Sequence, residues 1–228
     1  MAVKNSLEKM KSVVEKHQVV RHPFLKAFAG GRLTFDQVRR WAEQQFYFSI
    51  SLPSAFAALY ARVDDRFWME KRPLVGLINI EAWATGGPEA HSTFFIELAR
   101  FLDLNLPELT SRPPKVYTRQ YITARLNLCL DRPIVQGLAA IALANEILNL
   151  YIFDVYRQGI QKCVGLGCPT GYFDAHIRDE ESDFRVFQSL FDVIAQGEND
   201  LRFAEMAVSE LLNERIVFLD ALSKDLGI

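Results

Sequence analysis

Four carboxylates and two histidines are the residues of this chain whose types and spacing could do chemistry. Glu81 lies within the apolar run Leu74–Trp83, and Glu146 lies within the apolar run Ile134–Phe153. A buried carboxylate is costly unless it has a partner or binds a cation. An ion pair with Arg or Lys from another helix is the simpler explanation for each, and it stays open. The other candidates are His91, His176, Glu180 and Asp183.

The late cluster His176, Glu180 and Asp183 has the spacing i, i+4 and i+7, which places the three side chains on one helix face. Imidazole and carboxylate together suit iron or manganese better than zinc, which favours thiolate and imidazole. The simpler alternative is a solvated acidic face, because acidic residues fill most of positions 179–183. The spacing therefore makes a metal site one of two interpretations of this helix.

Taken together, the six residues come from four predicted helical segments. A lone histidine in a first helical turn is commonly exposed, so His91 belongs to the set only if Glu81 shares its site. Four carboxylates and two histidines are the ligand composition of the carboxylate-bridged di-iron sites that are built in helix bundles. This composition predicts two non-haem iron ions, with manganese as the other candidate metal and O₂ as a co-substrate.

The elements that must position these residues are helices, because capping boxes and glycine breaks recur along the chain. We expect helices over Ser6–Gln18, Pro23–Ala29, Phe35–Leu52 with a continuation from Pro53 to Val63, Arg66–Thr85, Pro88–Leu102, Val116–Leu130, Pro133–Gln161, Tyr172–Ala195 and Asp200–Leu226. The first two capping boxes are Asn5–Glu8 and Thr34–Gln37, and Asn105–Pro114 is expected to be a loop. No strand pattern, repeat or linker interrupts the chain, which predicts one all-α domain over residues 1–228.

The composition excludes several classes of protein. A chain of 228 residues that is 50% hydrophobic can bury a core, and its net charge of -2 lacks the basic bias of a nucleic-acid binder. The run Ile134–Phe153 contains Gln136, Asn145 and Glu146, so we expect a buried helix and no membrane span. Three cysteines form an odd count and the first residues lack the apolar core of a secretory signal, which predicts a reducing cytoplasm.

The N-terminal part of the chain resembles the haem-oxygenase-like superfamily, in particular the group of CADD-like proteins and, more loosely, PqqC and TenA. The resemblance is carried by His22-Pro-Phe24, Gly31–Thr34, Gln37, Trp41, Phe46-Tyr47, Pro53 and Ala61–Asp65. It implies a bundle of seven to eight helices around a central pocket, a small-molecule substrate and a homodimer. Four aromatic residues are expected to shape the substrate pocket, although aromatic residues at helical spacing are more often core: Trp41, Phe46, Tyr47 and Tyr60.

The di-iron oxidases of this superfamily carry Glu and His on one core helix, Glu on a second helix and His-x3-Asp-x2-His on a third. The matching residues are, in chain order, Glu81, His91, Glu146, His176, Glu180 and Asp183. Nine residues separate Glu81 from His91 where the family has six. Glu180 replaces the family's Asp, and Asp183 replaces its last His. The resemblance therefore implies a di-iron site with an altered ligand set.

Three functions follow from these observations. The first is an O₂-dependent di-iron oxidoreductase, the second is a metal-free oxidase similar to PqqC, and the third is a non-catalytic interaction protein on the same fold. Leu25 stands where the chlamydial members have the tyrosine that they convert to para-aminobenzoate. The segment Ala142–Ile147 lacks the catalytic cysteine of TenA. The resemblance therefore does not extend to either of those two chemistries.

Overall fold

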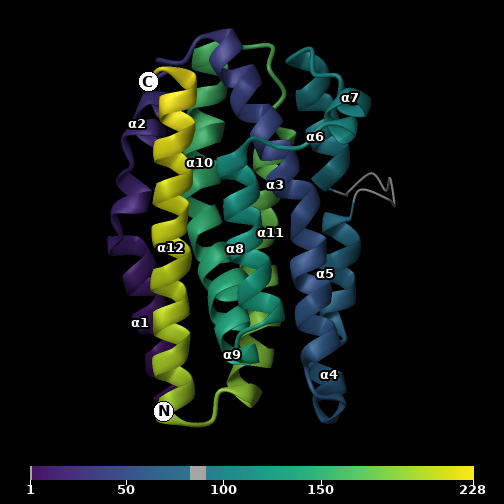
Figure 1. Ribbon diagram of the computed structural model, residues 1–228, viewed down its shortest axis with the longest axis vertical. Coiled ribbons are helices and arrows are strands. Elements are labelled where there is room, and N and C mark those ends of the chain that lie inside the picture. Colours follow the sequence, from purple (N-terminus) through teal and green to yellow (C-terminus); the bar gives the residue numbers. More distant parts are fainter. Residues whose placement is uncertain (1, 83–90) are drawn as a thin grey trace.

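The computed structural model describes residues 2–82 and 91–228, apart from the side chains of residues 2–7, 180 and 181. Within these residues all regular structure is helical, and no strand occurs among them (Figure 1). The prediction of an all-α fold is therefore confirmed. The long helices are α1 (Ala2–Lys16), α3 (Phe35–Arg62), α8 (Val116–Leu130), α10 (Asn145–Val164), α11 (Gly171–Ile194) and α12 (Glu198–Leu226).

Shorter helical segments connect and extend the long helices. They are η1 (Gln18–Arg21), α2 (Pro23–Ala29), η2 (Asp65–Phe67), α4 (Trp68–Lys71), α5 (Pro73–Glu81), α6 (His91–Phe101), α7 (Leu106–Ser111), α9 (Ile134–Gly137) and the π-helical segment η3 (Leu138–Ala144). The segments α9, η3 and α10 follow one another without a break, as expected for Pro133–Gln161. Helix α3 likewise continues through Pro53, as predicted.

Some of the predicted boundaries hold and others are wrong. The capping box at α3 is present, because the amide of Gln37 donates to Thr34 Oγ1 at 3.3 Å and the amide of Thr34 donates to Gln37 Oε1 at 2.8 Å. Helix α1 begins at Ala2, so the expected cap at Asn5–Glu8 lies inside a helix. The expected helix Arg66–Thr85 is divided before Pro73, because proline has no N–H to continue the hydrogen-bond ladder.

Helix α7 lies in the stretch Asn105–Pro114, which the sequence analysis assigned to a loop. Asn105 is its N-cap, and the Asn105 side chain accepts a hydrogen bond from the amide of Glu108 at 3.2 Å. Asparagine is among the favoured residues at this position. The helix has six residues, which is too short to give a clear periodic pattern.

The helices enclose one continuous apolar cluster to which nearly all of them contribute. Helix α12 packs along α8 and α9, α3 packs along α8 and α5, and α10 packs along α11 and α2 (Figure 1). A Cβ atom at Gly159 of α10 would lie 2.2 Å from the carbonyl oxygen of Phe28 in α2. Only glycine therefore allows these two helices to approach so closely.

The stretch Ile134–Val164 is long and apolar enough to cross a membrane by length and composition. However, 78% of its most apolar window is buried inside the bundle. The prediction that this run forms a buried core helix is confirmed. Its burial also places Glu146 inside the fold, where α10 packs against α11.

Candidate metal centre

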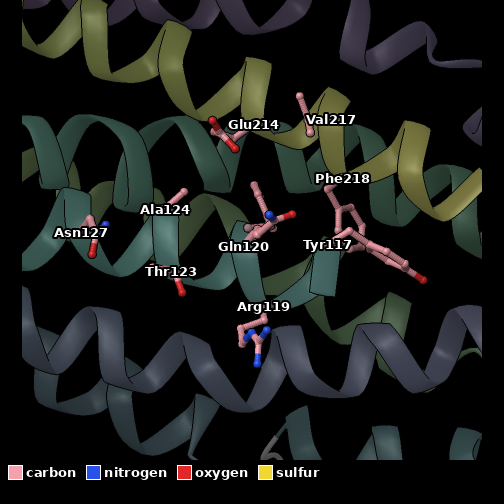
Figure 2. Close-up of a pocket in the computed structure, with 10 residues that line it drawn as sticks. Tyr117, Arg119, Gln120, Thr123, Ala124, Asn127, Glu214, Val217 and Phe218 are labelled. Atoms are coloured by element: carbon pink, nitrogen blue, oxygen red, sulfur yellow. The ribbon is translucent and has the colours of Figure 1, made fainter. Parts of the chain in front are cut away.

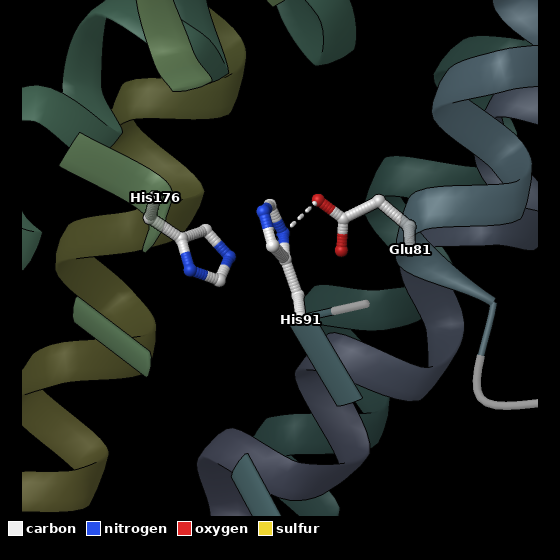
Figure 3. A group of neighbouring side chains, drawn as sticks. All are labelled: Glu81, His91 and His176. Atoms are coloured by element: carbon white, nitrogen blue, oxygen red, sulfur yellow. Dashed lines mark hydrogen bonds and ion pairs between the residues drawn. The ribbon is translucent and has the colours of Figure 1, made fainter. Parts of the chain in front are cut away.

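Glu81, His91 and His176 form a buried cluster between α5, α6 and α11 (Figure 3). One potential ligand atom of each residue lies within 4.8 Å of those of the other two. Glu81 is the last residue of α5 and His91 is the first residue of α6, while His176 projects from α11. Tertiary packing therefore assembles a cluster that is dispersed in the sequence.

His91 lies between two carboxylates. Its Nδ1 atom is 2.9 Å from Glu81 Oε1, and its Nε2 atom is 3.5 Å from Asp179 Oδ2. Burial alone would lower the pKa of His91, but the two carboxylates outweigh it and raise the pKa to about 9. The ring is then protonated at neutral pH and donates from both nitrogens. The protonated His91 therefore places a positive charge between Glu81 and Asp179. A metal cation bound there would neutralise the same two carboxylates.

Glu81 shows the other half of the same interaction. Burial favours the neutral carboxyl group, but the attraction to His91 and the hydrogen bond from it hold the pKa of Glu81 below its usual value. The side chain of Glu81 is thus a buried carboxylate that stays ionised. This is the state in which a carboxylate binds a metal ion.

His176 is held in the neutral form that a metal ligand requires. Its Nδ1 atom donates to the carbonyl oxygen of Tyr172 at 2.8 Å, which leaves Nε2 with a free lone pair. Its ring lies between the rings of Phe153 and His91, with both centroid distances at 4.0 Å. Burial and the positive charge of His91 lower the pKa of His176 to about 3. The imidazole is therefore uncharged at neutral pH.

Glu146 and Asp183 add negative charge beside this cluster. Glu146 is buried, and the side-chain amide of Asn145 donates to it at 3.4 Å. Asp183 is half-buried, and burial together with the charges of Glu146 and Glu81 raises its pKa to about 7. Carboxylates that repel one another in this way are stabilised by a divalent cation. The donor set of imidazole and carboxylate groups fits iron or manganese.

Of the six predicted ligands, the structure brings Glu81, His91 and His176 together. Asp183 is coupled electrostatically to Glu81 and His91, and Glu146 is coupled to Asp183. Glu180 belongs to α11, but its side chain is outside the described part of the chain. The ligand role of all six residues stays a prediction.

Asp179 is the residue that the sequence analysis missed, because it assigned this position to a solvated acidic face. Asp179 stands three residues after His176, and positions i and i+3 share a helix face as positions i and i+4 do. Arg178 also holds the Asp179 carboxylate, with two nitrogens at 2.7 Å from its oxygens. The spacing to His176 is the signal that could have identified Asp179.

The four aromatic residues expected in the substrate pocket lie in the packing of the bundle. Trp41 and Phe46 are each 1% exposed. The hydroxyl group of Tyr47 donates to the carbonyl oxygen of Leu109 at 2.8 Å, and Tyr60 is half-buried against the core. Their role as walls of a substrate pocket stays a prediction.

Several grooves open on the surface of the bundle, and two of them bear on the charged residues of its core. One has a volume of about 490 Å³ and lies between α10 and α11, where Glu146, Ile177 and Phe184 are among the residues that line it. The other has a volume of about 510 Å³ and lies between α8 and α12, where Tyr117 and Phe218 line it (Figure 2). The first groove reaches a predicted metal ligand, Glu146, and is therefore a candidate route to the cluster.

Comparisons with known proteins agree with this architecture. The chain is 24% identical to 4-aminobenzoate synthase of Nitrosomonas europaea over 187 residues, which cover 77% of this chain and 74% of that protein. A CADD-like protein of unknown function from Nostoc punctiforme superposes with a TM-score of 0.82 at 14% identity, covering 99% of this chain and 98% of that one. A domain from Shewanella denitrificans with a haem-oxygenase-like fold gives a TM-score of 0.76 at 15% identity, covering 98% and 91%.

These likenesses show a haem-oxygenase-like fold, and the sequence carries a more specific signal. The sequence pattern of one family matches residues 9–167, which is more than half of the chain. The chain therefore belongs to the TENA/THI-4/PQQC family.

Proposed function

We propose that this chain is an enzyme, an O₂-dependent non-haem oxidoreductase that acts on a small organic substrate. The observation that carries the proposal is the buried cluster of Glu81, His91 and His176, whose ligand atoms lie within 4.8 Å of one another. The similarity to a protein named 4-aminobenzoate synthase supports an enzymatic role.

Glu81, His91 and His176 are the proposed ligands of a first metal ion. Glu146 and Asp183, with the predicted ligand Glu180, would hold a second ion, and Asp179 could serve either position because it contacts His91. We propose iron for both positions, with manganese as the alternative metal.

A metal pair bound here would supply the one-electron chemistry that reactions with O₂ require. The chain's own residues prepare the site for it. The carbonyl group of Tyr172 fixes the tautomer and orientation of His176. His91 gives up one proton when it becomes a ligand, because a protonated nitrogen has no lone pair to offer. The ring of Phe153 covers one face of His176 and keeps water away from it.

The substrate is proposed to be a separate small molecule and not a side chain of the protein. Leu25 stands where the chlamydial members of the superfamily use a tyrosine, and Leu25 is 2% exposed within the core. An apolar side chain at this position offers nothing to convert into an aminobenzoate. The cytoplasmic location, the homodimer and the absence of nucleic-acid and membrane partners stay expectations from the sequence and the family resemblance.

The test is O₂ uptake by protein loaded with Fe(II) under anaerobic conditions and then mixed with oxygenated buffer. We expect the parent protein to consume O₂ faster than the same amount of free Fe(II), and His176→Ala to lose this excess. His17→Asn is the matched control, because His17 accepts a hydrogen bond from the amide of Val19 and asparagine can take over that role. Excess uptake that is equal in the parent and in His176→Ala would contradict the proposal.

A further inference from the structure

Two arginines lie in the core of the bundle without the partners that buried charges need. Arg125 of α8 is 1% exposed and Arg215 of α12 is 3% exposed. Among the residues that the structure describes, no hydrogen-bond partner is found for Nε, Nη1 or Nη2 of Arg125, or for Nε and Nη1 of Arg215. Burying an unpaired charge costs several kcal/mol, on the order of the stability of a whole domain.

Aromatic rings are the contacts that the two guanidinium groups do make. The Cζ atom of Arg125 lies 4.1 Å from the centroid of the Phe48 ring, and that of Arg215 lies 4.8 Å from the same centroid. Each cation–π contact contributes about 2 kcal/mol when it is desolvated, which offsets only part of the cost. Because both cations lie against one ring, they also repel each other, and burial together with this repulsion lowers the pKa of Arg125. The carboxylates of Glu146 and Glu81 attract Arg125, but no acceptor atom among the described residues takes a hydrogen bond from its guanidinium group.

Two phenol groups share this environment. The hydroxyl groups of Tyr121 and Tyr156 are both buried. No hydrogen-bond partner is found for that of Tyr121 among the described residues, whereas that of Tyr156 interacts with Arg215 and Trp41. Tyr121 packs near both arginines, and Tyr156 lies close to Arg215. Guanidinium groups can only donate hydrogen bonds, and phenols can donate as well. The cluster therefore presents donors in excess, and an anion with several acceptor oxygens would satisfy them.

We propose that Arg125 and Arg215 bind the carboxylate group of the substrate inside the bundle. A carboxylate matches the planar fork of a guanidinium group, and the two hydroxyl groups can serve its remaining lone pairs. The identification of this anion as the substrate rests on the function proposed above. Arg125 is close enough to Glu81 and Glu146 to interact with their charges, so the proposed anion site neighbours the candidate metal centre.

The groove between α8 and α12 is lined by two residues that also contact the pair. Tyr121 and Phe218 line this groove, and the centroids of the same two rings lie 5.4 Å and 5.1 Å from the Cζ atom of Arg215. The arginine nitrogens are packed against rings, so an entering carboxylate must displace one of them. Movement of Tyr121 or Phe218 would connect the groove to the arginines.

The test is calorimetric titration of the metal-free protein with a series of carboxylates, namely acetate, benzoate and octanoate, and with the neutral analogues benzamide and octanamide. We expect saturable binding of at least one carboxylate and at least tenfold weaker binding of its amide. Arg125→Met and Arg215→Met should each weaken that binding about tenfold to a hundredfold, as loss of charged hydrogen bonds does. Arg100→Met is the matched control, because Arg100 is an exposed arginine of α6 and does not line the groove.

Two further variants separate a loss of carboxylate binding from a loss of folding or of metal binding. Arg125→Lys keeps the charge but loses the bidentate fork, so it should bind the carboxylate more weakly than the parent even if a methionine variant fails to fold. His176→Ala should bind the carboxylate like the parent, which separates failure of this proposal from failure of the metal proposal. The proposal is overturned if no carboxylate binds the folded parent, if amides or inorganic phosphate bind as tightly, or if Arg125→Lys binds the carboxylate as tightly as the parent.

Discussion

Two groups of buried charges lie in this bundle, and they differ in how their charges are balanced. In the cluster of Glu81, His91 and His176, the protonated His91 lies between two carboxylates, and His176 donates to a backbone carbonyl. In the pair of Arg125 and Arg215, the described residues provide aromatic rings but no acceptor. In the first group a proton on His91 neutralises the carboxylates at the proposed metal position. In the second group the nearby carboxylates attract Arg125, but its N–H groups have no acceptor among the described residues. A buried charged group that has no hydrogen-bond partner within the protein therefore indicates a ligand site more directly than one that the protein itself neutralises.

Removing a member of the balanced cluster should have the largest effect on stability. Glu81→Leu leaves the buried His91 without its closest partner, so we expect the metal-free protein to lose about 3 kcal/mol of unfolding free energy. Urea denaturation in the presence of a chelator measures this. Glu97→Leu, at an exposed position of α6, should change the free energy by less than about 0.5 kcal/mol. Equal losses in both variants would show that Glu81 is not balanced by His91.

The balance at His91 should also appear as a dependence of stability on pH. The pKa of His91 is about 9 in the folded protein, whereas a histidine without these interactions has a pKa of 6.5. Between pH 6.5 and pH 9 the folded state therefore binds more protons than the unfolded state. The stabilisation is complete below pH 6.5 and is lost as the pH rises through 9, by on the order of 1–3 kcal/mol. Thermal melts of metal-free parent and His91→Gln from pH 6 to pH 9.5 measure the difference. A difference that stays constant over this range would contradict the assignment of charge to His91.

The unbalanced pair should respond in the opposite way. Arg125→Met removes a buried charge that has no hydrogen-bond partner among the described residues, and methionine fills much of the same volume. We expect the free energy of unfolding to rise by about 1–2 kcal/mol, because the lost cation–π contact offsets only part of the relieved burial cost. Denaturation in carboxylate-free buffer measures it. A loss of 3 kcal/mol or more would mean that the protein itself balances the charge of Arg125.

The smallest effect is expected at the second metal position. Asp183→His restores the residue type that the di-iron oxidases of the superfamily place there, and it removes a carboxylate whose pKa is raised to about 7 by burial and by Glu146 and Glu81. We expect the iron content of anaerobically loaded protein to rise by less than one ion per chain, at the weaker position. Asp192→His, in the same helix, is the control. Iron content that falls in Asp183→His would show that the aspartate is the better ligand.

Much of the fold could be predicted from the sequence because helix ends carry local signals. The capping box at Thr34–Gln37 and the apolar run Ile134–Phe153 each correspond to an observed helix. The local signals gave wrong helix boundaries where tertiary packing or a short length outweighs them. Asn5–Glu8 has the pattern of a cap but lies inside α1, and α7 is too short to show a period.

The two buried charge groups show why only part of the site was predictable. Glu81 was identified because apolar residues flank it in the sequence. Apolar residues stand three and four positions before and after both Arg125 and Arg215. A single arginine, however, does not show whether a neighbouring helix covers that face, and the packing of α8 against α12 buries both. Asp179 was missed for a related reason, because an acidic run does not tell which of its members faces inward.

The central claim is that Glu81, His91 and His176 bind a metal ion, and equilibrium binding of Fe(II) tests it most directly. The parent protein, His176→Ala and His17→Asn are dialysed anaerobically against micromolar Fe(II), and the bound iron is measured with the protein concentration. The account predicts about one to two ions per chain in the parent and in His17→Asn, and a loss of at least one ion in His176→Ala. Equal iron content in the parent and in His176→Ala, or no bound iron in any of the three, would contradict it.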